Sequence, residues 1–300
     1  MIKILSVILA VLFCLSATGC ESPAPGGSIA SGAPVRQDTE HTFESCVGGY
    51  RLVSAGSKYR NDASVVIPGE YNDQPVVAIG EDAFQGFSLM ETVVIPDTVT
   101  EIQKRAFKGC SQLDHVVIPD SVTTIRGAAF MGCSSLTEIT FGRGITTIEG
   151  ECFKMCSSLE TFTVPVTVTE IRGNCFENCT ALKTVNFHSA VTAIHGYAFA
   201  GCSQLEEIQL PPAITEIRGN TFESCVSLRS VSIPMGVTRI AAHAFAGCSA
   251  LSQVSVPSSV TEIGSSAFRD CGSLKSIAIP RSAQVDERAF KNCPADIQYV

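Results

Sequence analysis

The chain of 300 residues contains no tryptophan, only five histidines and no run of basic residues. Without tryptophan, one common platform for stacking sugar rings is missing. Phosphate binding needs concentrated lysine and arginine, so a net charge of −8 with scattered cations argues against a nucleic-acid partner. The sequence also lacks a nucleophile elbow, a P-loop, a dinucleotide-binding motif and histidines at metal-ligand spacing. We therefore expect no enzyme activity, no cofactor and no metal site.

What the chain has in abundance is periodicity. Phenylalanine recurs every 23 residues from Phe84 to Phe268, and Phe290 follows after 22. Leucine stands six residues after most of these phenylalanines, and isoleucine stands five residues before them. Because several independent positions stay in phase over most of the chain, the sequence predicts a solenoid in which each turn is covered only by its neighbours.

One repeat, LEEIQLPPAITEIRGNTF at residues 205–222, shows how a turn is built. Ile208 and Leu210 alternate inward, which predicts a short strand, and the two prolines that follow end it. A second inward-facing pair predicts another short strand, and a glycine permits a tight corner. Phe222 and Cys225 are three residues apart, a spacing that suits a helical turn. The predicted fold is an α/β solenoid, with a parallel sheet on one face and short strands and helical turns on the others.

The strand segment L-x-x-V-x-I-P resembles the core of a leucine-rich repeat, and the whole unit, IP..VT.I...AF..C..L..I.IP, resembles the BspA-like or treponeme-type repeat. The resemblance covers residues 65–300 and implies a leucine-rich-repeat solenoid. It also implies a secreted or surface-exposed protein that binds host matrix, host cells or other bacterial surface proteins. The first turn carries five extra residues near 70–74. Gly142 and His188 replace the proline that ends the strand, so these two turns are expected to pack more loosely.

The N-terminus, MIKILSVILAVLFCLSATGC, resembles a bacterial lipoprotein signal peptide, with small residues before Cys20. The resemblance implies removal of residues 1–19, lipidation of Cys20 and attachment to the cell envelope, at the outer membrane or cell surface of a bacterium. An ordinary secretory signal that ends near a cysteine is the alternative. Residues 20–45 are rich in proline, glycine, serine and alanine, which predicts a flexible tether. The solenoid would occupy 46–300, with an N-terminal cap and first turn at 46–83 and repeats at 84–300.

Nine cysteines share one position in the repeat, three residues after the phenylalanine. They are Cys110, Cys133, Cys156, Cys179, Cys202, Cys225, Cys248, Cys271 and Cys293. Equivalent residues of adjacent turns would lie about 4.8 Å apart, whereas a disulfide needs about 3.8 Å between Cβ atoms. We therefore expect buried free thiols that act as small apolar side chains. Cys152 and Cys175 stand one residue before the phenylalanine, where unpaired small side chains or a bridge would both fit.

Binding is expected on the outer face of the main parallel sheet, at positions eight and ten residues after each phenylalanine. The candidate residues are apolar near the N-terminal end and polar in the middle: Val94, His115, Val117, Glu138, Thr140, Thr163, Asn186, Glu207 and Gln209. Such residues also suit a pleated surface, so a purely structural interpretation stays open. A second row, in which Arg126, Glu149 and Arg172 alternate in sign, is either a recognition stripe or a solvated ladder of charges.

Two functions are consistent with these features. The first is a surface-displayed lipoprotein that binds a macromolecular partner as an adhesin does, with a protein as the expected partner. The second is a structural or assembly scaffold of the cell envelope that faces the periplasm. In both, the N-terminal lipid would be the contact with the membrane.

Overall fold

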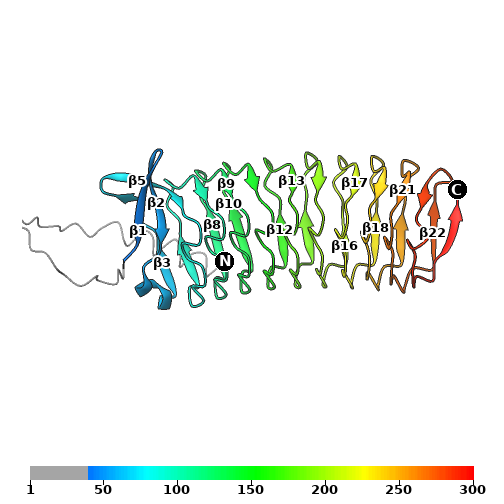
Figure 1. The fold of residues 1–300 in the computed structure, drawn as a ribbon, viewed down its shortest axis with the longest axis horizontal. Helices are drawn as coiled ribbons and strands as arrows, with labels where there is room; N and C mark the ends of the chain where they lie inside the picture. The colour runs from blue at the N-terminus through cyan, green and yellow to red at the C-terminus, as the bar shows by residue number, and fades with distance from the viewer. Residues whose placement is uncertain (1–39) are drawn as a thin grey trace, which may run out of the picture. The chain divides into compact units, whose positions relative to one another are not determined.

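The computed structural model describes residues 40–300, which form a long β-solenoid of stacked coils (Figure 1). Two strips of parallel strands run along it, here called the main sheet and the second sheet. The main sheet contains β3 (Ser64–Val66), β6 (Thr92–Val94), β8 (His115–Ile118), β10 (Glu138–Phe141), β12 (Thr161–Thr163), β14 (Thr184–Asn186), β16 (Glu207–Ile208), β18 (Ser230–Ser232), β20 (Gln253–Ser255), β22 (Ser276–Ile279) and β24 (Asp296–Tyr299). The second sheet contains β5 (Gln74–Ile79), β7 (Glu101–Ile102), β9 (Thr124–Ile125), β11 (Thr147–Ile148), β13 (Glu170–Ile171), β15 (Ala193–Ile194), β17 (Glu216–Ile217), β19 (Arg239–Ile240), β21 (Glu262–Ile263) and β23 (Gln284–Val285).

Neighbouring coils pair their strands in parallel, which confirms the predicted arrangement. In most pairs the partner residue lies 23 positions away, as for Ser230 and Gln253, so equivalent side chains stand in rows along the solenoid. Because the pleat alternates, Val231 points into the core and is 3% exposed, while Ser230 and Ser232 on either side face outward. The strict period of the sequence is thus the register of the sheet.

A continuous stack of ten phenylalanine rings fills the core. Adjacent ring centroids from Phe84 to Phe290 lie 5.1–5.9 Å apart, and adjacent ring planes are within 13° of each other. All of these rings except that of Phe290 are completely buried. Each ring covers the next one, and the last turn, which is one residue shorter than the others, still keeps the ring of Phe290 in the stack.

The corner that carries the phenylalanine contains no helix, so the predicted helical turn and the α/β class are wrong. Around Phe199, the residues Tyr197 and Gly201 have φ angles of 60° and 75°, and this left-handed region cannot continue a right-handed helix. The N–H groups of these three residues donate to carbonyls of the next coil at 2.7–3.2 Å, and those between them donate three residues back. The corner is therefore a chain of reverse turns. Within residues 40–300 the only helix is the short 3-10 helix η2 (Ser57–Asn61).

The hydrogen-bonded sheets are interrupted at a few coils. Both breaks of the second sheet, between β11 and β13 and between β15 and β17, follow the coils that lack the strand-ending proline. In the first of these coils the Gly142 N–H donates to the carbonyl of Ile118 at 2.7 Å. In the second, Nε2 of His188 lies 3.0 Å from the carbonyl of Pro165. These contacts hold each coil against the preceding one, and the ladder to the following coil is broken. The two turns that were expected to pack more loosely therefore lack a hydrogen-bonded ladder to the following coil.

The N-terminal end is closed by the antiparallel pair β1 (Thr42–Cys46) and β2 (Gly49–Ser54) together with η2. The folded unit therefore begins earlier than the predicted boundary at residue 46. Aromatic contacts hold this stretch, because His41 stacks on Tyr59 with ring centroids 4.2 Å apart and Phe43 stacks on Tyr71 at 4.3 Å. The predicted signal peptide and residues 20–39 of the tether lie outside the described residues.

The extra residues of the first turn, expected near 70–74, form a small hairpin. β4 (Glu70–Tyr71) pairs antiparallel with the start of β5. Asn72 and Asp73 between them have φ angles of 50° and 58°, a conformation that asparagine and aspartate tolerate better than most residues.

The last coil is covered on one side only. Its inward-facing residues Val285, Phe290, Cys293 and Ile297 are half-buried, whereas the equivalent residues one coil earlier are almost completely buried. Its strand β24 pairs with β22. A side chain of this coil therefore supports one neighbour, and a side chain in the middle of the solenoid supports two.

Candidate interaction surface

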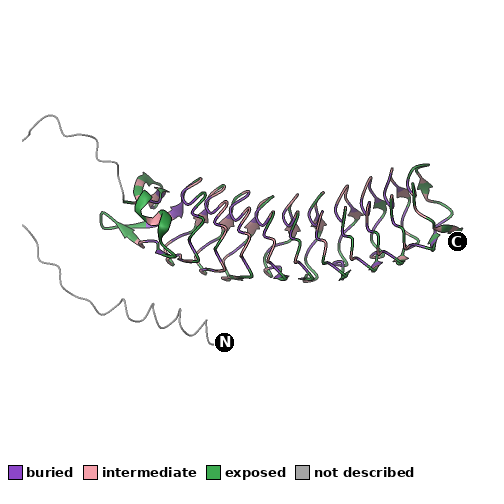
Figure 2. Ribbon diagram, turned by 90° about the horizontal axis from the view of Figure 1, so that it is seen from below, coloured by how far each residue is buried: buried purple, intermediate pink, exposed green. Residues whose placement is uncertain are grey.

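All nine candidate residues occupy outward-facing positions of the main sheet. Exposed and buried residues alternate along the coils (Figure 2). Val117 is 57% exposed, whereas Val94 is only partly exposed. His115 is also partly exposed, and its Nδ1 lies 3.9 Å from a carboxylate oxygen of Asp114. The other six, Glu138, Thr140, Thr163, Asn186, Glu207 and Gln209, are exposed. Strand alternation therefore predicted the direction of these side chains.

Sequence reasoning missed one member of the apolar row, Val66. It pairs in register with Val94 in the next coil and is 62% exposed. Counting from the phenylalanines did not reach it, because the first turn is five residues longer than the others. The signal was nevertheless present, since SVVIP at residues 64–68 repeats as TVVIP at 92–96 and HVVIP at 115–119.

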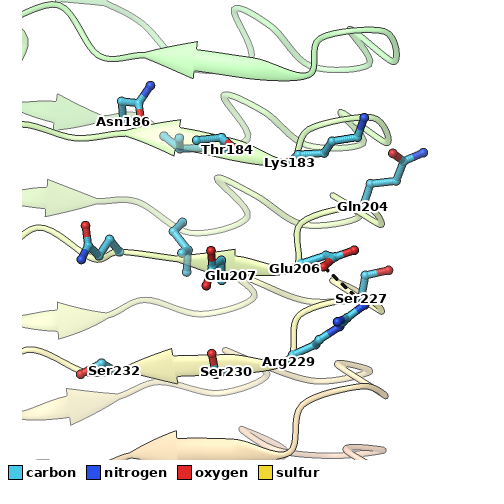
Figure 3. Close-up of a pocket in the computed structure, with 13 residues that line it drawn as sticks. Lys183, Thr184, Asn186, Gln204, Glu206, Glu207, Ser227, Arg229, Ser230 and Ser232 are labelled. Carbon is cyan, nitrogen blue, oxygen red and sulfur yellow. Dashed lines mark ion pairs between the residues drawn. The ribbon is translucent and has the colours of Figure 1, made fainter.

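A groove of about 1040 Å³ lies over β14, β16 and β18 in the middle of the main sheet (Figure 3). It brings together three of the candidate residues, Asn186, Glu207 and Gln209, and leaves the other six outside. Figure 3 shows hydroxyl groups of Thr184, Ser230 and Ser232 along the strands and charged side chains of Lys183, Glu206 and Arg229 where the coils turn. The groove is therefore polar and has no aromatic residue in its lining.

This groove coincides with one of the breaks in the main sheet. β14 pairs with β12, and β16 pairs with β18, but β14 and β16 belong to separate sheets. Where the ladder is intact, the backbone N–H of Lys183 donates to the backbone carbonyl of Glu160 at 2.8 Å. The N–H of Arg229 donates to the carbonyl of Glu206 at the same distance. The equivalent bond from the Glu206 N–H to the Lys183 carbonyl is absent from this described part of the chain. Two neighbouring strands therefore separate beneath the groove.

The charges of the groove are unequally compensated. Lys183 pairs with Glu160 at 3.0 Å, and Arg229 pairs with Glu206 at 3.4 Å. Glu207 is exposed and has neither an ion-pair nor a side-chain hydrogen-bond partner among residues 40–300. The Asn186 amide donates to Thr163 Oγ1 at 3.0 Å, which leaves its carbonyl oxygen free to accept. The groove therefore offers one uncompensated carboxylate among hydroxyl and amide groups.

The alternating charges beside the second sheet are compensated within the row. Arg126 lies 2.6 Å from Glu101 and 2.8 Å from Glu149. Arg172 lies 3.0 Å from Glu170. Exposed pairs of this kind contribute about 0–1 kcal/mol each. Because these charges already satisfy one another, the structure favours a solvated ladder over a recognition stripe.

The repeat sequence and the stacked coils point to one family. Residues 77–200 and 171–295 match the model of the BspA type leucine-rich-repeat region (6 copies). The chain belongs to this family. BspA-type repeats therefore account for almost the whole solenoid, and they confirm the resemblance of the repeat unit.

Several solved bacterial structures are similar to this BspA-type chain. A leucine-rich cell surface protein from Faecalibacterium prausnitzii is 28% identical with a TM-score of 0.60, over 90% of this chain and 96% of that chain. A leucine-rich-repeat protein from Bacteroides ovatus is 24% identical with a TM-score of 0.57, over 87% and 89%. The pneumococcal vaccine antigen PcpA is 17% identical with a TM-score of 0.55, over 82% and 75%, and shares the fold. No curated protein sequence matches the chain.

The cysteines of the BspA-type repeats are free thiols, as predicted, and all nine except Cys293 are buried. Each buried thiol donates a hydrogen bond to the phenylalanine carbonyl of the preceding coil, for example Cys225 Sγ to Phe199 at 3.2 Å. Cys152 and Cys175 are also buried and unpaired. Burial raises the pKa of the Cys110, Cys152, Cys179, Cys225 and Cys271 thiols from 9.0 to about 12. The row thus places hydrogen-bonded thiol groups inside an apolar core.

No group of three or more histidine, cysteine, aspartate or glutamate side chains within residues 40–300 is arranged to hold a metal ion. Over the same residues, the structure has no helix with the length and apolar character of a membrane span.

Proposed function

We propose that this protein is displayed on a bacterial surface through a lipid on Cys20 and binds a protein partner with the outer face of its main sheet. The observation that carries the proposal is the composition of this face. It holds an apolar row at Val66, Val94 and Val117 and, farther along, a polar groove that contains Glu207. Long regular surfaces of this kind suit macromolecules better than small molecules.

Family membership supports surface display, since the relative from Faecalibacterium prausnitzii is itself a cell surface protein. The apolar run before Cys20 supports a lipid anchor, in line with the sequence pattern. The alternative function, a periplasm-facing scaffold of the envelope, shares the anchor and the solenoid. The two functions differ in whether the solenoid is exposed on the outside of the cell or faces the periplasm.

Anchoring and display can be tested in one experiment. Labelled palmitate should enter the wild-type protein in its bacterial host and should not enter Cys20→Ala. Protease added to intact cells should remove the solenoid of the wild type while a periplasmic marker survives. Equal labelling of both proteins would disprove lipidation at Cys20, and full protection of a labelled wild type would support the periplasmic scaffold.

The apolar row gives a separate test of partner binding. Val94→Glu combined with Val117→Glu should fold as the wild type does and should reduce capture of a partner from matrix extract by about tenfold or more, because a buried unpaired carboxylate opposes binding. Ser255→Glu combined with Ala278→Glu is the matched control, since these residues occupy the same row at the other end of the sheet. The measurement is quantitative pull-down, with circular dichroism to verify folding. Undiminished capture by the valine variant would move the binding surface away from this row.

A further inference from the structure

The carboxylate of Glu207 stands out among the charges of the groove. Neighbouring acidic groups such as Glu160 and Glu206 already have a lysine or arginine partner from the next coil. Glu207 has none, although its exposed side chain lies in the groove beside Lys183 and Arg229, which are engaged elsewhere. An exposed carboxylate without a counter-ion is an available partner for a cation from another molecule.

The surroundings of Glu207 keep this charge uncompensated. The outward positions on the strands of the main sheet from Thr92 to Ala278 contain no lysine or arginine. Directly beside Glu207, Ser230 is its partner in the parallel register, and Thr184 occupies the same position in the preceding coil. The hydroxyl and amide groups of the groove can donate or accept hydrogen bonds but do not neutralise a carboxylate.

The break between β14 and β16 adds hydrogen-bonding capacity beneath this site. Because the Glu206 N–H and the Lys183 carbonyl do not bond to each other, backbone groups are left open along the line where the groove lies. The two coils stay adjacent, with Phe176 and Phe199 stacked at 5.4 Å, so an extended peptide would lie over these groups on the outer face and would not pair as a strand between β14 and β16. A compact small molecule would use few of them.

Other classes of ligand fit less well. The groove has no aromatic side chain on which a sugar ring could stack. Its uncompensated charge is negative, so a phosphate-rich ligand such as a nucleic acid would be repelled. A protein segment that is polar, extended and basic matches both the charge and the hydrogen-bonding groups.

We infer that the groove over β14, β16 and β18 binds an extended polar segment of the partner protein and that a lysine or arginine side chain of this segment pairs with Glu207. This inference rests on the proposed function and names the chemistry of the partner. The amides of Asn186 and Gln209 then serve the peptide groups beside the basic side chain. Glu138 lies in the same row of the main sheet, is likewise exposed and lacks an ion-pair partner among residues 40–300, but lies outside the groove.

Glu138 therefore provides a matched control for Glu207. The probes are fluorescent short peptides of serine and threonine with one central lysine, arginine, glutamine or glutamate, measured by anisotropy. On the wild type, the lysine and arginine peptides should bind about tenfold more tightly than the glutamine peptide, since a charge-assisted hydrogen bond is gained. Glu207→Gln should abolish this preference, and Glu138→Gln should retain it. Added salt should weaken the preference on the wild type.

Several results would overturn the inference. The basic peptides could fail to bind the wild type, or the lysine and glutamine peptides could bind it equally. The preference for basic peptides could also survive Glu207→Gln, or disappear equally in Glu138→Gln. Binding of a cello-oligosaccharide in place of the peptides, unchanged by Glu207→Gln, would assign the groove to carbohydrate instead. Protease accessibility on intact cells does not depend on Glu207, so a failure here would leave surface display intact. Circular dichroism and thermal unfolding of both variants exclude a folding defect.

Discussion

Phe199→Ala should lower the free energy of unfolding by about 3–5 kcal/mol, the loss expected when a buried phenylalanine leaves a cavity. Its ring is completely buried and stacks on Phe176 at 5.4 Å and on Phe222 at 5.7 Å. Removal of the ring therefore opens both neighbouring interfaces of a solenoid in which each coil is supported by two others. Denaturant titration followed by circular dichroism measures the loss.

Two variants serve as controls for this prediction. Phe290→Ala should cost clearly less, because Phe290 is half-buried and stacks on Phe268 alone, at 5.2 Å. Phe199→Leu keeps most of the apolar volume and should cost less than the alanine variant. The slope of the titration must be compared as well, since a split transition would mean that the halves of the solenoid unfold separately. Equal losses at positions 199 and 290 would contradict nearest-neighbour coupling.

Alkaline pH should unfold the protein cooperatively between about pH 9 and 11 in the presence of a reductant. Ten cysteines are buried, and burial raises the pKa of thiols such as Cys225 from 9.0 to about 12. The unfolded chain releases these protons above pH 9 while the folded chain keeps them, so stability is fully present below pH 9 and falls as pH rises. At pH 10 each thiol that the fold keeps protonated costs on the order of 1 kcal/mol, so ten together cost on the order of 10 kcal/mol, comparable to the whole stability of a typical domain.

The number of protons released on unfolding isolates this effect from a general loss of stability. Cys202→Ala combined with Cys225→Ala will be less stable at neutral pH, because two buried side chains and two hydrogen bonds to carbonyls are lost. Between pH 9 and 10, however, its free energy of unfolding should fall less steeply, by about one proton at pH 9 and nearly two at pH 10. Denaturant titrations at closely spaced pH values measure both slopes. Equal slopes for variant and wild type would show that the thiols do not drive the transition.

The corner of each coil shows why a correct pattern led to a wrong element. Phe199 and Cys202 are three residues apart and both are buried, which fits a helical turn as well as it fits two linked reverse turns. Glycine would have indicated the left-handed positions, but many coils use other residues there, among them Arg105, Tyr197 and His243. Hydrogen bonds from the corner to carbonyls of the next coil stabilise this conformation, and the sequence of a single repeat does not reveal them.

The candidate site was predicted in part. Strand alternation predicted that Asn186, Glu207 and Gln209 face outward, since side chains of a strand alternate with a period of two. The replacement of proline by His188 marked the coil after which the ladder opens. Two features depend on the positions of side chains from three coils. One is the groove over the break, and the other is that Glu207 lacks a counter-ion while Glu160 and Glu206 have one.

The sequence by itself determined the solenoid, its parallel register, the row of buried thiols and the identity of the residues on the outer face, because a strict period repeats the same contacts at every coil. Only the tertiary structure decided the nature of the corners, the start of the fold at β1, the groove over one of the breaks and the pairing of surface charges. These features arise from departures from the period and from contacts between coils. The free energy of such contacts depends on distances across the stack, and these are not written in any one repeat.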